Sequence, residues 1–541
     1  MIMKKTFIIV LCIICTMLIS WKNPSVTNEY NIVDYGAKGD GVTVNTKIIN
    51  EVIVKCSAAG GGIVLIPAGT FISGTVLLQS DVNLQLSAGA ILKGSTDTAD
   101  YLPLKDSRQW REGYKHYGLV LAINAKNISI TGQGQINGNG THFMYGIDKP
   151  HNSGDFERKY TRQGENFMKQ GDRFEDGPVS YSHRPGYMIN FEHCENIQLL
   201  NIYIYDSPEW TVRISDCEQA KVSGITIDNN VLIPNSDGIN CSNSRNVSIS
   251  DCNISTGDDA IIVNGFSDQR FDPKKDHSIP DNTVTGNKTD MAEYITVTNC
   301  VLSSRSACIR VGDGEHPIRN LIFSNIVMHA SNRGIGIFSR HNAQIENVIF
   351  SNIIMKTRLF SGHWWGKGEP IHISAVKDYS ADVNGGKVKN IRFIDIIADA
   401  ETGIVINGSA GSVIENILLE RVKLTVHRGK HSDTYGGNFD LRPAFPPDSA
   451  LFKHDIPGLY AQHVKNLTLS GMEINWGNGL PQFFTNGIEV HHFNGLTIEN
   501  TTSRPAFNTS GLAAIKLKSG SGERLLNNIA ANGSIKLIKE K

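Results

Sequence analysis

A short strand pattern that recurs about every 26 residues constrains the fold of this 541-residue chain more than any other feature. The copies usually open with asparagine: Asn320 and Asn347 are 27 residues apart, and Asn390 and Asn416 are 26 apart. A period in the mid-twenties indicates a solenoid, in which each repeat packs only against its neighbours. The strands are short, rich in Ile, Val and Thr, and separated by Gly, Asn, Asp and Ser, without an amphipathic helix between them.

This pattern predicts an all-β, single-domain, right-handed parallel β-helix over residues 28–541. Each coil contributes three short strands, and successive coils stack about 4.8 Å apart. The leading asparagines are interpreted as stacked turn residues. Residues 45–58 have helical spacing of apolar side chains, which suits a helix that caps the open end. Longer segments at 267–292, 359–387 and 426–459 are expected to form loops over a groove, where substrate selection usually lies.

Charge and composition exclude several classes of function. Lys and Arg number 52 and Asp and Glu number 53, so the chain lacks the basic excess of a nucleic-acid-binding protein. Residues 1–24 resemble a signal peptide, with two lysines before a short apolar run, and an uncleaved anchor is the alternative. No later segment is apolar enough for a membrane span. We therefore expect a secreted or periplasmic protein, and a monomer.

Seven cysteines follow the signal region, and they are too widely spread for a zinc site or a disulfide scaffold. Most are expected to be small buried apolar residues, although one bridge is compatible with their number.

Two Asp-bearing segments lie almost one coil apart. Asp237 belongs to an Asn-Ser-Asp-Gly run, and Asp258 and Asp259 follow Gly257, so the gap from Asp237 to Asp258 is 21 residues. If both segments lie on one sheet, the carboxylates stack and at least one pKa is raised. Glycoside hydrolysis needs this arrangement, with one protonated acid and another carboxylate that activates water. An Asp ladder in turns or a calcium site is the alternative.

With these motifs in view, the chain resembles glycoside hydrolase family 28, the polygalacturonase family, whose fold is a pectin-lyase-like solenoid. The resemblance implies an inverting hydrolase without a cofactor or metal. It further implies that Asp258 is the general acid and that Asp237 and Asp259 hold and activate the water. The runs that carry it lie at residues 33–41, 60–70, 207–210, 235–240 and 257–260.

The chain departs from the family at two motifs. Ala307 stands where the family has the His of Gly-His-Gly, and Gly336-Ile337-Phe338 stands where it has Arg-Ile-Lys, which grips a galacturonate carboxylate. Arg310, Arg340 and Arg333 are the candidates to replace these groups, because arginine can bind a carboxylate with two hydrogen bonds. Solvated arginines at the rim of the groove are the alternative.

Four further residues are candidates for substrate binding. Trp364 and Trp365 lie among glycines in a predicted loop and could form a platform for sugar stacking, or pack the loop onto the solenoid. Glu369 follows closely as a fourth carboxylate, and His183 precedes a predicted core strand in a run that resembles a groove-facing stretch of the family.

The sequence predicts a hydrolase of a pectic, galacturonate-containing polysaccharide or oligosaccharide. Because the usual carboxylate grip is missing, an exo-acting or otherwise specialised enzyme is favoured. A polysaccharide lyase, a hydrolase of another acidic or neutral polysaccharide, and a non-catalytic binding solenoid remain the alternatives.

Overall fold

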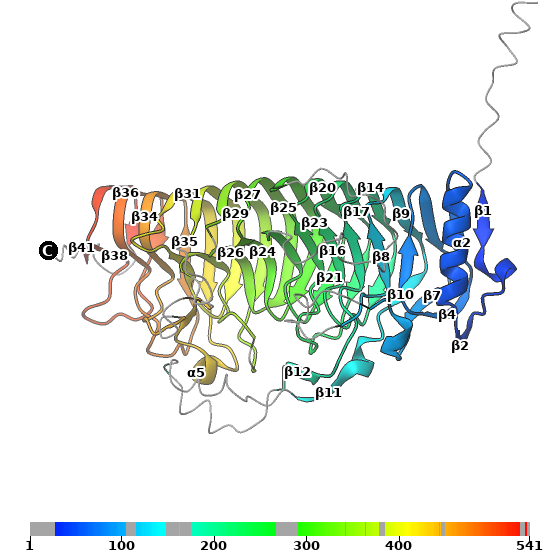
Figure 1. The fold of residues 1–541 in the computed structure, drawn as a ribbon. Helices are drawn as coiled ribbons and strands as arrows, with labels where there is room; N and C mark the ends of the chain where they lie inside the picture. Colours follow the sequence, from blue (N-terminus) through cyan, green and yellow to red (C-terminus); the bar gives the residue numbers. More distant parts are fainter. Residues whose placement is uncertain are drawn as a thin grey trace, which may run out of the picture.

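The computed structural model describes residues 28–103, 115–147, 162, 175–266, 290–340, 342–362, 364–377, 385–442, 444, 450–530 and 536–537. The predicted signal peptide at residues 1–24 lies outside this part. The described chain winds into a right-handed parallel β-helix (Figure 1), and 37 strands are joined by parallel pairing between successive coils. The predicted fold class is confirmed.

The wound sheet has three faces, and each strand pairs with the strand one coil before and one coil after it. The first face, here called the groove face, consists of β5 (Val76–Leu78), β8 (Val120–Ile123), β13 (Ile189–Glu192), β16 (Val212–Ser215), β19 (Ile239–Ser242), β22 (Ile261–Gly265), β24 (Ala307–Gly314), β26 (Arg333–Ser339), β28 (Ile371–Ala375), β30 (Ile404–Asn407), the first parts of β34 (Leu459–Ser470) and β36 (Ile488–Glu499), β38 (Ile515–Lys518) and β41 (Lys536–Leu537).

The other two faces share five long strands that bend from one face into the next: β23 (Ala292–Ser304), β25 (Ile318–Ser331), β27 (Gln344–Thr357), β29 (Lys387–Ala400) and β31 (Ile414–Val426). The second face also contains β1 (Glu29–Asn31), β3 (Gly62–Ile66), β6 (Val82–Leu86), β9 (Lys126–Gly132), β14 (Glu195–Leu200), β17 (Glu218–Ser223), β20 (Arg245–Ser250) and β39 (Ser521–Leu526). The third face adds β2 (Asp40–Val44), β4 (Gly69–Ser73), β7 (Ala90–Gly94), β10 (Gln135–Asn137), β15 (Tyr203–Tyr205), β18 (Thr226–Asp228), β21 (Asn253–Thr256), β35 (Glu473–Trp476), β37 (Thr502–Ser503) and β40 (Ile529–Ala530).

The core is a continuous column of stacked apolar side chains. Phe323, Phe350 and Phe393 occupy equivalent positions in three consecutive coils, with ring centroids 4.9 and 5.1 Å apart and planes within 10°. The seven described cysteines are buried and free. Since every coil covers the apolar side chains of the next, the interior is closed along its length.

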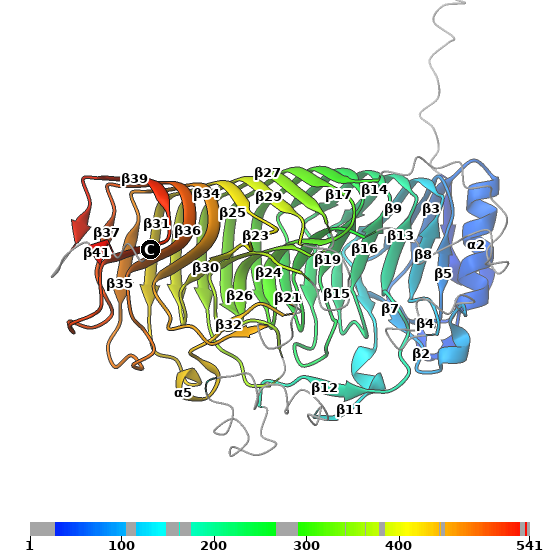
Figure 2. The ribbon, with the colours of Figure 1, turned by 60° about the vertical axis from the view of Figure 1, so that its left-hand side comes forward.

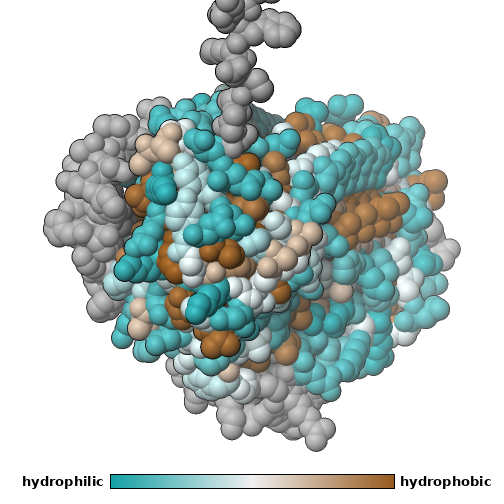
Figure 3. Space-filling model, turned by 90° about the vertical axis from the view of Figure 1, so that its right-hand side faces the viewer, coloured by the Kyte–Doolittle hydropathy of each residue, from teal (hydrophilic) through white to brown (hydrophobic). Residues whose placement is uncertain are grey.

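The leading asparagines form the predicted stack. Asn347 donates to Asn320 at 3.1 Å, and Asn390, Asn416 and Asn466 continue the ladder at 3.1, 3.1 and 2.9 Å. All five have φ between 55° and 58°, the left-handed conformation that asparagine tolerates better than most residues. Seen from the N-terminal end, hydrophilic rows run along the solenoid beside a hydrophobic stripe (Figure 3).

The predicted capping helix is α2 (Thr46–Ala58), which covers the N-terminal end of the solenoid (Figure 1). Its buried residues are Ile49, Val52, Ile53 and Cys56, the apolar positions that the sequence pattern picked out. Among the described residues, no helix is long and apolar enough to span a membrane.

The described parts of two predicted insertions, 359–387 and 426–459, lie along one side of the solenoid (Figure 2). The segment predicted as a loop at 359–387 contains a further groove strand, β28, and the segment at 426–459 contains α5 (Ser432–Tyr435), β32 (Phe439–Asp440) and β33 (Leu451–Phe452). A hairpin of β11 (Met144–Ile147) and β12 (Val179–Tyr181) joins this side. The segment at 267–292 lies outside the described residues up to residue 289. The remaining short 3-10 helices are η1 (Ile32–Tyr35), η2 (Thr98–Asp100) and η4 (Gly140–Phe143).

Truncation of the stacked Phe350 tests the contribution of the core column. Phe350→Ala should lower the free energy of unfolding by about 3–5 kcal/mol, because it leaves a cavity between two rings. Ile354→Ala on the same strand is the control, since Ile354 is 55% exposed and its loss should cost well under 1 kcal/mol. Chemical denaturation measures both, and equal costs would contradict the column as a main source of stability.

Candidate active site

The outward side chains of the groove face lie in register and form the floor of the candidate site. Ile214, Cys241 and Val263 alternate with them and point into the core. The outward row in chain order is Leu121, Asn190, Arg213, Asn240, Ile262, Arg310, Gly336 and His372. Polar and charged side chains therefore dominate the middle of this floor.

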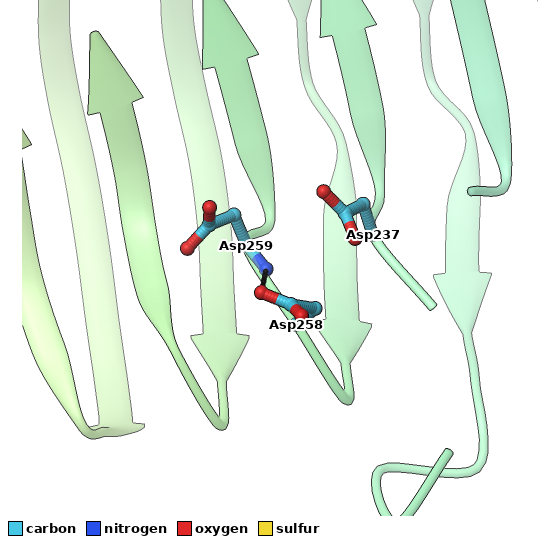
Figure 4. A group of neighbouring side chains, drawn as sticks. All are labelled: Asp237, Asp258 and Asp259. Carbon is cyan, nitrogen blue, oxygen red and sulfur yellow. Dashed lines mark hydrogen bonds between the residues drawn. The ribbon is translucent and has the colours of Figure 1, made fainter. Parts of the chain in front are cut away.

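The two predicted Asp motifs occupy turns that enter neighbouring groove strands. Asp237 lies just before β19, and Asp258 and Asp259 lie just before β22, which pairs with β19 in register. One carboxylate oxygen from each residue lies within 4.8 Å of the other two (Figure 4). The sequence spacing therefore places the three carboxylates in one cluster, as predicted.

The residues beside these Asp side chains lock the two turns together. The Gly238 backbone N–H donates to the Asp259 carbonyl at 2.9 Å, and the Gly257 N–H donates to Ser236 Oγ at 3.0 Å. A Cβ at Gly238 would collide with the carbonyl oxygen of Ala260, so a side chain does not fit where the two turns meet. The Asn-Ser-Asp-Gly and Gly-Asp-Asp patterns are thus requirements of packing as well as of chemistry.

Burial and mutual repulsion change the acidity of the cluster. Burial, then the charge of Asp259, raises the pKa of Asp258 from 3.8 to about 7, and Arg310 moderates the rise. Burial and the neighbouring carboxylates of Asp258, Asp259 and Glu209 hold the pKa of Asp237 well above its usual range. At neutral pH the cluster therefore retains a proton, which is what a general acid requires.

The carboxylate of Asp259, in contrast, lies beside two hydrogen-bond donors. Its carboxylate accepts hydrogen bonds from Arg310 Nη1 at 2.9 Å and from the backbone N–H of Ala307 at 2.8 Å. Ala307, which replaces the family's histidine, is fully buried and contributes its backbone in place of an imidazole. Arg310 thus lies directly at the carboxylate cluster, as one of the three arginines proposed from the sequence.

The three candidate arginines converge on the ring of Phe338. The guanidinium carbons of Arg310, Arg333 and Arg340 lie 5.9, 5.0 and 4.6 Å from its centroid. Asp313, which the sequence analysis did not single out, joins two of them: it contacts Arg310 and lies 3.4 Å from Arg340 Nη1. The three arginines therefore form one cluster around the aromatic ring of Phe338, and their replacement of the Arg-Ile-Lys motif stays a prediction.

A loop segment at residues 439–442 covers part of this cluster. Arg333 Nη2 donates to the Asp440 carbonyl at 3.1 Å, and Arg340 Nη2 donates to the Arg442 carbonyl at 2.9 Å. Both arginines are only 3% exposed, whereas the Arg310 side chain is 21% exposed. Of the three, Arg310 is therefore the one most accessible from the groove.

Glu369 lies in the same covered region, where protein groups surround its carboxylate. It is fully buried, lies 3.5 Å from Arg333 Nε, and accepts from the backbone N–H groups of Lys367 at 2.7 Å and Asp440 at 3.2 Å. The Arg333 charge and its other partners outweigh burial and lower the pKa of Glu369 to about 2. Glu369 thus holds the covering segment in place and is not open to substrate in this arrangement.

The two tryptophans do not form one platform. Trp364 is 5% exposed and donates from Nε1 to the Asp176 carbonyl at 3.1 Å, so it packs its loop onto the protein. Trp365 is 38% exposed and its ring lies 5.7 Å from the Arg340 guanidinium carbon. Only Trp365 offers an open ring face beside the site. His183 is exposed, while its neighbour Arg184 is buried against the Asp237 turn.

On the other side of the carboxylates, the floor carries a polar network that the sequence analysis missed. Arg213 pairs with Glu192 and donates to Ser215 Oγ at 2.9 Å, and its guanidinium lies 5.0 Å from the Tyr187 ring. Asn240, between Arg213 and the Asp-bearing turns, is fully buried, and neither atom of its amide has a hydrogen-bond partner among the residues that the structure describes. The alternation of residues along a strand predicts that these side chains face outward, but it does not predict which of them contact one another.

The Asp cluster is also the only group of His, Cys, Asp or Glu side chains, among the described residues, whose oxygen, nitrogen or sulfur atoms are close enough together for a metal ion. The sequence analysis gave a calcium site as an alternative. A bound cation would have to use the same carboxylates that retain the proton.

The chain belongs to family 28 of the glycosyl hydrolases, because the family model matches residues 56–437. A probable polygalacturonase of Vitis vinifera is 29% identical over 248 residues, which cover 44% of this chain and 45% of the relative. An exo-poly-alpha-D-galacturonosidase of Dickeya chrysanthemi is 27% identical over 347 residues, which cover 57% of each protein. The chain thus spans about half the length of these curated relatives.

Solved structures share the fold. An exopolygalacturonase of Yersinia enterocolitica has a TM-score of 0.61 at 20% identity, covering 88% of this chain and 78% of its own. The exopolygalacturonase of Thermotoga maritima has a TM-score of 0.58 at 19% identity, covering 84% of this chain and 93% of its own.

The raised pKa of Asp258 predicts a pH-dependent effect on stability. The folded state favours protonated Asp258. The contribution of this group to the free energy of unfolding is therefore complete below pH 3.8, its ordinary pKa, and is lost as the pH rises through about 7. Asp258→Asn removes this titration. The melting temperature of the variant should therefore rise relative to that of wild type between pH 3.8 and about 7, and the difference should then stay constant. Asp34→Asn, at an exposed carboxylate, is the control, and a constant difference for Asp258→Asn would contradict the shift.

Proposed function

We propose that the protein hydrolyses glycosidic bonds in a pectic, galacturonate-containing polysaccharide or oligosaccharide. The single observation that carries this proposal is the cluster of Asp237, Asp258 and Asp259, in which a proton is retained near neutral pH beside an arginine-paired carboxylate. Membership of family 28 supports the same reaction class.

In this proposal Asp258 donates its proton to the leaving glycosidic oxygen. Asp259, held by Arg310 and the Ala307 N–H, and Asp237 orient the water that attacks the anomeric carbon. The proton of that water passes to a carboxylate of the cluster, so each turnover restores one proton there, and the reaction inverts the anomeric configuration. No cofactor enters these steps.

An anionic substrate fits the charges around the Phe338 cluster. Four arginines, Arg310, Arg333, Arg340 and Arg442, lie among four carboxylates, those of Asp259, Asp313, Glu369 and Asp440. The Arg310 side chain is 21% exposed, so a sugar carboxylate beside it could accept a charge-assisted hydrogen bond from its guanidinium.

An exo-acting or otherwise specialised mode is part of the proposal. Residues 439–442 lie over Arg333 and Arg340, on the strand that follows Arg310 along the groove. A polysaccharide chain that follows the floor toward β28 would meet this segment soon after the carboxylates. We further propose that the protein is exported, which the apolar N-terminal run predicts and a polymeric substrate requires.

Hydrolysis should be detected as release of reducing sugar from a panel of pectic polysaccharides and oligosaccharides, with activity falling as the pH rises through about 7. Asp258→Asn should lower kcat by about 10²–10⁴-fold, the usual contribution of a general acid. Asp395→Asn, whose carboxylate pairs with Arg421 on another face, is the control. No turnover on the panel, or an unsaturated lyase product that a chelator abolishes, would contradict the proposal.

The covered groove predicts a narrow set of first products. From oligogalacturonides labelled at one end, early digestion should yield one short product released from a chain end, with little change in the viscosity of polygalacturonate. Chromatography of the labelled products measures this. A broad early distribution of mid-length oligomers would show that the groove is open at both ends.

A further inference from the structure

Arg184 is a buried cation that lies outside the carboxylate cluster but contacts the turn that carries Asp237. Its Nη1 donates to the carbonyl oxygens of Pro208 at 2.6 Å and Pro234 at 2.8 Å, and its Nη2 donates to Asn235 Oδ1 at 3.0 Å. Its guanidinium stacks 3.9 Å from the centroid of the Tyr181 ring. One planar group thus bridges two successive coils at the point where the chain enters the active site.

The contact with Asn235 has consequences for both acids. Asn235 has φ of 56°, a left-handed conformation, and it lies two residues before Asp237. Its backbone amide hydrogen-bonds to the Asp258 carboxylate and lowers the pKa of that group against the larger effect of burial. The side chain that Arg184 holds and the amide that contacts Asp258 therefore belong to the same residue.

Arg184 also faces a carboxylate that acts on the cluster. Glu209 Oε1 lies 3.8 Å from Arg184 Nη2, and both side chains are at most 1% exposed. The Glu209 charge contributes to the raised pKa of Asp237. Glu209 also accepts a hydrogen bond from the Trp210 backbone N–H, but loss of Arg184 would remove a positive charge that opposes the effect of Glu209 on Asp237.

We propose that Arg184 is a positioning residue for the hydrolytic site, which fixes the Asn235 turn and shields Glu209 so that Asp237 and Asp258 keep their geometry. The kinetic part of this inference rests on the proposed function. It assigns the role to a side chain that reaches the acids only through Asn235 and Glu209.

The test compares Arg184→Gln, Asn235→Gly and the control Arg245→Gln. Asn235→Gly keeps the left-handed backbone and removes only the acceptor of Arg184. Arg245 forms a 3.0 Å ion pair with Glu293 on the second face, away from the groove. Kinetics on a pectic oligosaccharide, measured from pH 4 to 9, give kcat, KM and the positions of both limbs of the pH profile.

We expect Arg184→Gln to lower kcat by about tenfold to a hundredfold with little change in KM, as for a small misplacement of catalytic groups. Both limbs should move to higher pH, because loss of the Asn235 hydrogen bond raises the pKa of Asp258 and loss of the Arg184 charge beside Glu209 raises that of Asp237. Asn235→Gly should move the upper limb in the same direction, and Arg245→Gln should move neither. Folded Arg184→Gln with unmoved limbs would overturn the proposal. If that variant does not fold, unmoved limbs in Asn235→Gly would overturn it.

A second readout does not need turnover. The melting-temperature gain of Asp258→Asn over its parent should level off at a higher pH in the Arg184→Gln background, or in the Asn235→Gly background, than in wild type. If wild type cleaves no pectic substrate, the proposed hydrolysis is wrong. The melting curves would then still decide whether Arg184 controls Asp258, and an unchanged levelling pH would refute that control.

Discussion

Hydrogen bonding between successive coils is the constraint on which the site depends. Each groove strand pairs in register with the strand of the next coil, and the turns that enter these strands follow the same register. The Thr211 N–H donates to the Asp237 carbonyl, and the Gly238 N–H donates to the Asp259 carbonyl, both at 2.9 Å. Because these bonds fix the backbone, carboxylates that would repel one another are held together and must share a proton instead of separating.

The same stacking determines which arginines beside the carboxylate cluster are exposed. Arg333 begins β26 and Arg340 directly follows it, both beside the Phe338 ring. The carbonyls of residues 440 and 442 and the carboxylates of Glu369 and Asp313 contact these two arginines. Arginines that would otherwise line an open groove thus anchor the segment that covers it. Of the three, Arg310 has the most exposed side chain and pairs with Asp259, so in the proposed function it would link substrate charge to the carboxylate cluster.

The sequence could predict what depends on period and on local motifs. The 26–27-residue steps define the solenoid, the apolar spacing at 45–58 defines α2, and the Asp237–Asp258 gap of almost one coil defines the cluster. Contacts between insertions could not be predicted, because no period relates them. Trp364 is hydrogen-bonded to Asp176, Glu369 to Asp440, and Arg184 to Asn235. Each of these contacts depends on how a loop folds back over the groove face. Adjacent tryptophans in a glycine-rich segment therefore have different environments despite identical sequence signals.

The most direct test of this account is a crystal structure of Asp258→Asn with a bound oligogalacturonide. The account predicts that the glycosidic oxygen of the bond to be cleaved lies within hydrogen-bonding distance of the side chain at position 258. It also predicts a sugar carboxylate beside Arg310 and a chain end that abuts residues 439–442. An oligosaccharide bound away from the three carboxylates, or one that runs past residues 439–442 along the floor of the groove, would contradict it.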